Sequence, residues 1–521
     1  MAKTFDLKDD SVVVVIGSGA GGGTLANELA QIGVDVVCLE AGERLSITDL
    51  RDYSQADSML GRLTWLDKRI GTGDLHAALP LFVCKTVGGT TVQWAGATLR
   101  FQEHEFKTRT VYGDIEGANL LDWPLSLRDL EPFYNEAEDK MGVTGTHGIP
   151  RLPGNNNYRV LEAGARRIGY QSVHTGNMAI NSEPRDNRPA CRQIGFCTGG
   201  CAIGAKWSTL YTEIPKAEAT GHFELRPNSM ALRLTHGSQG CIDGVIYADN
   251  AGNHFEQKTR AVCVAGNSVE TPRLLLNSES YEFPQGLANT SGQVGRNFMR
   301  HTTGTVYAIM PGRVSFERGT QMAGVVTDES AFDPRRGFVG GYEIETLPGF
   351  GLVNLATNLS PSAWGSDYAQ ILEKYEYFAG LWLVGEDLPQ ASNGVTLHPT
   401  ERDQHGLSVP MIHFIDHPND VAMRTHAFRS GRAIYESLSA ESVFELPPGP
   451  STHNMGTCRQ SEKPRDGVCN AYGQCHDIPN LFISDGSQFT SSSAENPTLT
   501  IVALAIRQAR YLADRLRRGE M

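Results

Sequence analysis

Residues 12–22 read VVVVIGSGAGG, which is the most informative stretch of the chain for the fold. Its consecutive aliphatic residues predict a short strand that is buried on both faces of a parallel sheet. The glycines that follow fit G-x-G-x-x-G, and apolar residues recur at helical spacing over residues 20–32. Gly33 ends that helix, and residues 34–39 predict a second strand. This order of strand, glycine-rich turn, helix and strand predicts a dinucleotide-binding unit of the Rossmann type.

The residues of this motif have separate tasks in binding a dinucleotide. Gly17 makes the turn, Gly19 lets the backbone approach a pyrophosphate, and Gly22 lets the helix pack on the strand. The unpaired N–H groups at the helix N-terminus then face the phosphates. Glu40 ends the second strand, at about the distance where a carboxylate binds ribose hydroxyls. The stretch predicts a dinucleotide without distinguishing NAD from FAD.

The remaining strands of this unit lie far along the chain. Residues 261–265 and 481–483 are short apolar runs of the same buried kind, and residues 498–517 predict a helix. One sheet assembled from discontinuous segments follows. Residues 111–200 and 300–460 are turn-rich and less regular, which predicts a second, interleaved domain. Two or three structural units fit the length of 521 residues.

Composition narrows the classes of function. With 40% hydrophobic and 20% charged residues, the chain is typical of a soluble globular enzyme. The net charge is −13 and no Lys/Arg-rich run occurs, which argues against nucleic acid as a partner. No apolar run near the N-terminus approaches the ~20 residues of a transmembrane helix, and no secretory signal precedes the first strand. We expect a cytoplasmic protein unless a partner subunit carries it across a membrane.

Several further segments resemble the glucose-methanol-choline (GMC) family of flavin oxidoreductases. The matching segments read VGGTT at 87–91, AGNSVETP at 265–272, VGRN at 294–297, HNMGT at 453–457 and NP at 496–497. They occur in the family's order along the whole chain. The resemblance implies that the cofactor at the fingerprint is FAD.

The resemblance also implies the fold class and the domains. We expect an α/β architecture in which a Rossmann-like FAD-binding domain of discontinuous segments is joined to an interleaved α+β substrate-binding domain. The FAD-binding domain is predicted at 1–110, 200–300 and 465–521, and the substrate-binding domain at 111–199 and 301–464. In addition to the fingerprint and Glu40, the residues expected to bind FAD are Gly88, Gly89, Thr90, Asp485, Pro497 and Thr498.

The same resemblance assigns a catalytic pair. Removal of a hydride from an alcohol carbon leaves a hydroxyl proton, and a neutral histidine is suited to accept it. The family's base corresponds to His453, and its partner corresponds to Asn496, which would orient the substrate oxygen and stabilise developing alkoxide charge. Some family members attach FAD covalently through a histidine just after the Gly-Gly loop. Residues 92–94 read VQW, so we expect non-covalent FAD.

Three cysteines fall in one glycine-rich segment, residues 188–206. Cys191, Cys197 and Cys201 have C-x5-C-x3-C spacing, which is suited to an iron–sulfur cluster. A structural loop remains an alternative, as do a disulfide and a zinc site completed by Cys241 or His174. The segment, together with TVYG at 110–113 and DWP at 122–124, is similar to the catalytic subunits of bacterial FAD-dependent glucose dehydrogenases. This narrower resemblance implies a [3Fe-4S] cluster on the three cysteines.

The narrower resemblance also implies a sugar or glycoside substrate and electron delivery through the cluster to a cytochrome or quinone acceptor. It further implies a small export or chaperone subunit, a cytochrome c subunit, and periplasmic residence by co-export. Two alternatives keep the fold: an oxygen-using alcohol oxidase, and a polyol dehydrogenase without a functional cluster. A third is a non-catalytic flavoprotein, which the presence of both His453 and Asn496 argues against.

Overall fold

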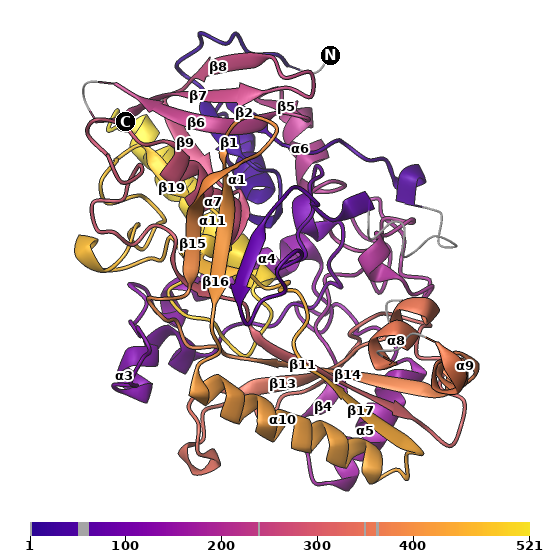
Figure 1. The fold of residues 1–521 in the computed structure, drawn as a ribbon. Helices are drawn as coiled ribbons and strands as arrows, with labels where there is room; N and C mark the ends of the chain where they lie inside the picture. Colours follow the sequence, from indigo (N-terminus) through magenta and orange to yellow (C-terminus); the bar gives the residue numbers. More distant parts are fainter. Residues whose placement is uncertain (1–2, 51–61, 238–239, 349–350, 361–363) are drawn as a thin grey trace.

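The computed structural model describes residues 3–50, 62–237, 240–348, 351–360 and 364–521. Its sheets lie in two regions, and the chain passes between these regions several times. Figure 1 shows β1, β2 and β9 in the upper region and a broad sheet containing β11, β13 and β14 in the lower one. Both regions have their own hydrophobic core.

The parallel sheet is the core of the upper region. Its strands, in spatial order, are β19 (Leu481–Ile483), β9 (Ala261–Val264), β1 (Val13–Ile16), β2 (Val36–Leu39) and β5 (Phe223–Arg226). Val13 pairs with Val36 on one side and with Ala261 on the other. The one sheet of discontinuous segments is therefore confirmed. β5 was not predicted because only its first residue is fully buried, as is common at a sheet edge.

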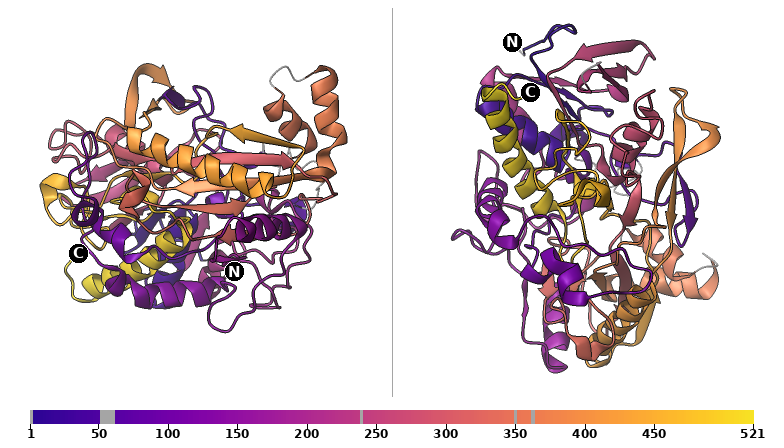
Figure 2. Two further views of the ribbon diagram at one scale, coloured as in Figure 1. Left: turned by 90° about the horizontal axis from the view of Figure 1, so that it is seen from below. Right: turned by 90° about the vertical axis from the view of Figure 1, so that its left-hand side faces the viewer.

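Helices cover this sheet where the apolar spacing places them. The first, α1 (Ala20–Gln31), directly follows the fingerprint, and α11 (Thr498–Arg517) packs against it, as Figure 2 shows. Both predicted helices are confirmed. α11 also packs against α4 (Leu127–Met141), which begins with a capping box between Ser126 and Asp129. The other helices of this region are α3 (Thr108–Tyr112), α6 (Glu213–Thr220) and α7 (Asn267–Asn277).

The lower region is built on a six-stranded sheet. Its spatial order is β17 (Ser442–Leu446), β11 (Thr302–Ile309), β14 (Phe378–Gly385), β13 (Tyr342–Thr346), β12 (Gly324–Val326) and β4 (Val173–Thr175), all antiparallel to their neighbours. α10 (Pro418–Glu436) and α5 (Asn156–Arg167) pack on this sheet. α8 (Leu352–Leu359) and α9 (Gly365–Glu373) lie at one end of it (Figure 1).

Two further sheets complete the fold. One is mixed, in the order β18 (Met455–Thr457), β10 (Arg296–Met299), β15 (Gly394–Arg402), β16 (Ser408–Phe414) and β3 (Ile70–Gly73). The other is antiparallel and contains β6 (Met230–His236), β7 (Ile242–Ala248) and β8 (His254–Lys258). The mixed sheet contains strands from both predicted domains, so it does not mark a boundary between them. The predicted domain boundaries therefore stay a prediction.

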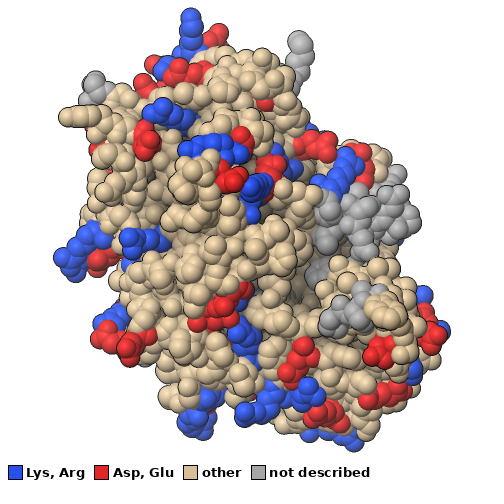
Figure 3. All heavy atoms as spheres, in the orientation of Figure 1, with Lys and Arg blue, Asp and Glu red and all other residues tan. Residues whose placement is uncertain are grey.

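The surface agrees with the charge pattern of the sequence. On the face shown in Figure 3, Lys and Arg alternate with Asp and Glu, and no continuous basic stripe crosses it. Across the described residues, no helix combines the length and the apolar character needed to span a membrane.

Candidate active site

One large cavity connects the two regions and gathers most of the predicted residues. Its volume is about 820 Å³. The predicted residues that line it are Gly17, Gly19, Glu40, Gly89, Thr90, His453, Asp485, Asn496, Pro497 and Thr498. Gly22 and Gly88 do not line it. The fingerprint and the predicted catalytic pair therefore border a single space.

The fingerprint forms a cradle that only small residues fit. Gly17 has a φ of 95°, and a Cβ at this position would lie 2.4 Å from the carbonyl oxygen of Ala265. A Cβ on Gly22 would lie 2.0 Å from the Gly17 oxygen, so Gly22 lets α1 pack against the turn. α1 has no side-chain cap and no acidic residue in its first turn. Its free N–H groups are thus available to a phosphate, and the cradle fits a dinucleotide.

Glu40 lies at the end of β2 beside this cradle. Its Oε2 accepts hydrogen bonds from the backbone N–H and the hydroxyl of Ser18, at 3.0 and 2.7 Å, and Oε1 accepts one from the Gly42 N–H. Burial raises the pKa of Glu40, although these donors counteract the shift. The carboxylate is therefore held rigidly at the cavity wall, in part by the fingerprint itself.

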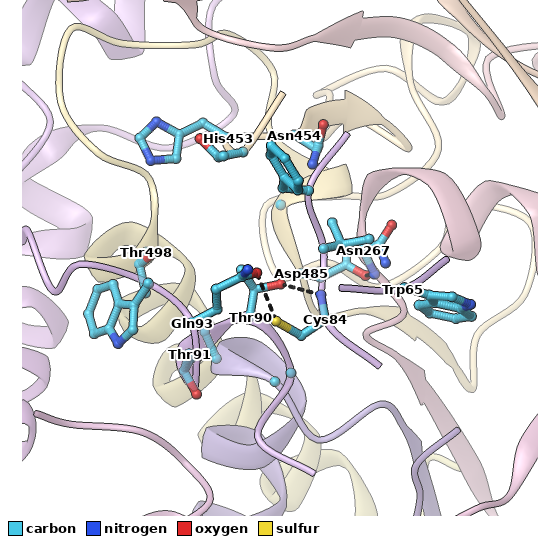
Figure 4. A pocket seen from close by; sticks show the side chains of 18 of the residues that line it. Trp65, Cys84, Thr90, Thr91, Gln93, Asn267, His453, Asn454, Asp485 and Thr498 are labelled. Carbon is cyan, nitrogen blue, oxygen red and sulfur yellow. Dashed lines mark hydrogen bonds between the residues drawn. The ribbon is translucent and has the colours of Figure 1, made fainter. Parts of the chain in front are cut away.

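The loop over the fingerprint is fixed by its glycines and by Cys84. Gly88 is in the left-handed conformation, and a Cβ on Gly89 would lie 2.9 Å from the Gly19 Cα, so loop and fingerprint approach closely. The Cys84 N–H donates to Thr90 Oγ1 at 3.2 Å, and its thiol donates to Gln93 Oε1 at 3.0 Å (Figure 4). Gln93 also lines the cavity.

Asp485 borders the cavity, but its carboxylate is occupied by the protein. Oδ2 accepts hydrogen bonds from the Asn267 N–H and the Thr271 hydroxyl, and Oδ1 accepts one from the Ser487 N–H. These bonds tie the start of α7 to the segment after β19. Pro497 is the N-cap of α11 and Thr498 its first residue, so both present the helix N-terminus to the cavity.

The predicted base, His453, is paired with a second histidine. His453 Nδ1 lies 2.8 Å from His301 Nδ1, and His301 Nε2 is hydrogen-bonded to the Ser493 carbonyl oxygen. The ring of Trp382 also lies beside that of His453, with 5.1 Å between ring centroids and 52° between the ring planes. Figure 4 shows His453 across the cavity from Thr90 and Gln93.

This arrangement fixes which nitrogen of His453 carries the proton. A carbonyl oxygen only accepts, so His301 Nε2 must carry a hydrogen, and a neutral His301 then accepts at Nδ1. His453 must donate from Nδ1, which leaves a lone pair on its Nε2. Burial lowers the pKa of His301 to about 4, and burial together with His301 lowers the pKa of His453 well below its usual value. Both rings are neutral at pH 7, as a base requires.

The backbone around His301 is held by Asp387. Its carboxylate accepts from the N–H groups of Arg300 and His301, at 2.7 and 3.1 Å, and His301 has a φ of 66°. His301, Trp382 and Asp387 were not predicted from the sequence. Only His301 carried a signal: it lies two residues after β10, and His453 lies two residues before the strand that pairs with β10.

Asn496 lies at the cavity wall just before α11 and is buried. Its side-chain amide contacts the carboxyl of Glu345, a residue of β13, and lowers the pKa of that carboxyl. Its Oδ1 has no hydrogen-bond partner among the described residues. His453 and Asn496 therefore border the same cavity as the dinucleotide cradle. The residue that contacts the Asn496 side chain, Glu345, belongs to the sheet of the lower region.

Cys191, Cys197 and Cys201 pack together with a small apolar group of residues around Met178. Neither alone nor with Cys241 or His174 do they have ligand atoms all within 4.8 Å of one another, so the described residues form no single-ion site there. The backbone N–H of Gln193 donates to Cys191 Sγ and that of Lys206 to Cys201 Sγ, at 3.4 and 3.5 Å. None of the ten cysteines forms a disulfide.

Comparison with known proteins adds to this geometry. Two family models described as GMC oxidoreductase match residues 71–303 and 389–505. The 2-methyl-1,2-propanediol dehydrogenase of Mycolicibacterium austroafricanum is 31% identical over 97% of this chain and 96% of its own. The fructose dehydrogenase large subunit of Gluconobacter japonicus is 28% identical over 97% of this chain and 98% of its own.

The fold also matches a solved structure. Pyridoxine 4-oxidase from Mesorbium loti superposes with a TM-score of 0.72 at 18% identity, over 97% of this chain and 99% of the other. The Rossmann-like sheet joined to a second sheet is therefore the fold that this oxidase shares. Together with the family models, these findings show that the chain belongs to the GMC oxidoreductase family and is an FAD-dependent oxidoreductase acting on CH–OH groups.

Proposed function

We propose that the protein is a dehydrogenase that oxidises a hydroxyl of a sugar or glycoside, with His453 as the base and Asn496 as the group that orients the substrate oxygen. The observation that carries the proposal is the histidine pair. Because His301 accepts the Nδ1 proton of His453, the basic lone pair of His453 is on Nε2. His453 borders the same cavity as the dinucleotide cradle.

In the reaction, His453 Nε2 takes the hydroxyl proton while the carbon loses a hydride. FAD, when bound non-covalently at the fingerprint, supplies the hydride acceptor. The charge that develops on the substrate oxygen is stabilised by a donor from Asn496, which a buried site makes stronger than the same donor in water. Trp382 packs against His453 and excludes water from one side of its ring.

The substrate class is supported by the relatives. The name of one relative gives fructose as its substrate. Another relative, at higher identity, is named for a branched diol. A diol or polyol dehydrogenase is therefore the second candidate, and it uses the same residues.

We further propose that electrons leave through a [3Fe-4S] cluster on Cys191, Cys197 and Cys201. The surroundings of Lys206 favour an anionic group beside these three cysteines. Its fully buried ammonium donates only to the carbonyl oxygens of Val92, Trp94 and Cys197, at 2.9, 2.5 and 2.5 Å. No ion pair with a carboxylate is formed by Lys206 in the described part of the chain, and an uncompensated buried cation is costly.

Partners follow from the same proposal. Fructose dehydrogenase is named as a large subunit, which indicates an assembly in that protein. We propose a cytochrome c or quinone as acceptor, a small export subunit, and periplasmic residence by co-export.

The test is an anaerobic absorbance and EPR titration of the purified protein with glucose, a methyl glucoside, fructose and 2-methyl-1,2-propanediol. Bleaching of the flavin by a sugar supports the first candidate, whereas bleaching by the diol alone supports the second. A three-iron EPR signal that is absent from Cys197→Ser and present in the control Cys241→Ser supports the cluster. If the wild-type protein contains flavin but no iron, the proposed electron relay through a cluster is wrong.

A further inference from the structure

The wall behind Asn496 contains an unusual concentration of buried acid. Five glutamates, each at most 3% exposed, lie in or next to it: Glu105, Glu343, Glu345, Glu386 and Glu495. None of them forms an ion pair with Lys or Arg within the described residues. Isolated buried carboxylates are costly, so burial raises the pKa of four of these groups: Glu105, Glu343, Glu345 and Glu495.

Glu345 is the member of this group that contacts the proposed site. It lies on β13 directly opposite Trp382 of β14, and Trp382 packs against His453. Paired residues of neighbouring strands share a face of the sheet, so Glu345 is on the cavity side. Glu343 is two residues earlier on the same face.

Two buried polar atoms near this contact lack partners. Asn496 Oδ1 and Glu345 Oε2 are both without a hydrogen bond in the described structure, although the two side chains are in contact. Asn496 lowers the pKa of Glu345, as an N–H donor to the carboxylate does, so we infer that its amide nitrogen is the atom that faces Glu345 while Oδ1 is left unpaired. A half turn of the amide directs Oδ1 to Glu345, but this requires a proton on the carboxyl.

We propose that Glu345 is a positioning residue that stays a neutral carboxylic acid, donates its proton to Asn496 Oδ1, and so directs the Asn496 amide nitrogen toward the substrate oxygen. One hydrogen bond then satisfies both unpaired atoms. The inference rests on the proposed role of Asn496 as the donor to the substrate. A carboxylate would instead hold the amide nitrogen and present an acceptor to the substrate.

The surroundings favour the neutral acid. The titratable groups that face this side of the sheet are Glu343 on β13, Glu495 next to Asn496, and His453 beyond Trp382. The glutamates interact repulsively with one another, which disfavours charge on any of them. Burial raises the pKa of Glu345 to about 8, although the contact with Asn496 lowers it.

The kinetic test compares three proteins by anaerobic stopped-flow flavin reduction between pH 6 and 10, with the substrate that the titration above identifies. In wild type, the reduction rate should fall above about pH 8, where Glu345 loses its proton. Glu345→Gln keeps a neutral donor, so it should stay within about threefold of wild type at pH 7 and lose the alkaline fall. Glu345→Ala should be at least about tenfold slower than wild type at pH 7, and the difference should shrink above about pH 8, where wild type also lacks the donor.

Two results would overturn the inference. If Glu345→Gln is as slow as Glu345→Ala, the site needs a carboxylate or only its packing. If Glu345→Gln keeps the alkaline fall, another group causes it.

Thermal unfolding separates this inference from the proposed function because it needs no substrate. A raised pKa contributes stability below the unfolded value of about 4.3, and that stability is lost as pH rises toward the folded value. The melting temperature of Glu345→Gln relative to wild type should therefore increase from pH 5 to 9. A constant difference shows that Glu345 is ionised in the fold and overturns the inference. If this difference increases with pH but no sugar reduces the flavin, the proposed substrate is wrong and the inference on Glu345 still holds.

Discussion

The histidine pair allows a quantitative prediction for His301. Replacement of His301 by Leu removes the acceptor at 2.8 Å from His453 Nδ1. The productive tautomer of His453 then keeps a buried N–H without a partner, which costs about 1–3 kcal/mol. Because about 1.4 kcal/mol corresponds to a tenfold change, flavin reduction should slow by about 5- to 150-fold. His453 can avoid this cost by moving its proton to Nε2. That nitrogen then has no lone pair with which to accept the substrate proton.

His301→Asn is the matched control. Its carbonyl oxygen offers an acceptor near the position of the lost Nδ1, and Asn tolerates the left-handed backbone that His301 adopts, with φ at 66°. We expect His301→Asn to be faster than His301→Leu. Leu is strained at this φ, so its stability also falls, but the reduction rate per bound flavin does not measure that loss.

The assay is the limiting rate of flavin bleaching in anaerobic stopped flow, at saturating substrate and pH 7, after the flavin content of each variant is equalised by absorbance. A His301→Leu variant that bleaches at the wild-type rate would contradict this prediction, because the Nδ1 contact would then not fix the tautomer. Equal slowing of the Leu and Asn variants would point to packing.

Three further predictions concern the cradle, the cysteine segment and acid stability. Gly17→Ala should purify without FAD, because its Cβ would lie 2.4 Å from the Ala265 oxygen; a normal ratio of flavin to protein absorbance would contradict this. Lys206→Met should lose the iron EPR signal while it retains flavin, and an unchanged signal would show that the ammonium does not support the cluster. His301 has its pKa lowered to about 4, so it binds protons more readily in the unfolded chain, where its pKa is about 6.5. The stability that this neutral ring contributes is lost as pH falls from about 6.5 toward 4. The melting temperature of wild type should therefore fall more steeply over this range than that of His301→Asn, and parallel curves would contradict it.

The strands of the parallel sheet other than β5 could be predicted because each of them is buried on both faces. Continuous apolar runs at residues 12–16, 261–265 and 481–483 record that burial directly. β5 could not be predicted in this way because its Glu224 and Arg226 pair with each other at a sheet edge. The hydrophobic pattern of a strand thus depends on whether the strand is central or at the edge of the sheet. The residues of the strand itself do not specify that position.

The candidate site likewise contains residues that a local motif predicts and residues whose position depends on strand pairing. The fingerprint is local, so its glycines identified the cradle from spacing alone. Glu345 had no such signal because a glutamate in a strand usually faces water, and its burial depends on the pairing of β13 with β14. Asp485 shows the opposite case: it borders the cavity, but hydrogen bonds from Asn267, Thr271 and Ser487 occupy its carboxylate.

The pairing of the two histidines depends on a one-residue irregularity that composition cannot reveal. In the antiparallel pair β10–β18, Arg296 is opposite Thr457, and this register continued would place His301 opposite Thr452. A bulge shifts the register by one residue, so Met299 is opposite Met455 and His301 comes opposite His453. A bulge re-aims side chains in this way. Gly456 makes it possible, with a φ of 74° and no Cβ to meet the Asn297 oxygen at 2.1 Å. The glycine in HNMGT therefore has a structural task on which the position of His453, the proposed base in the same segment, depends.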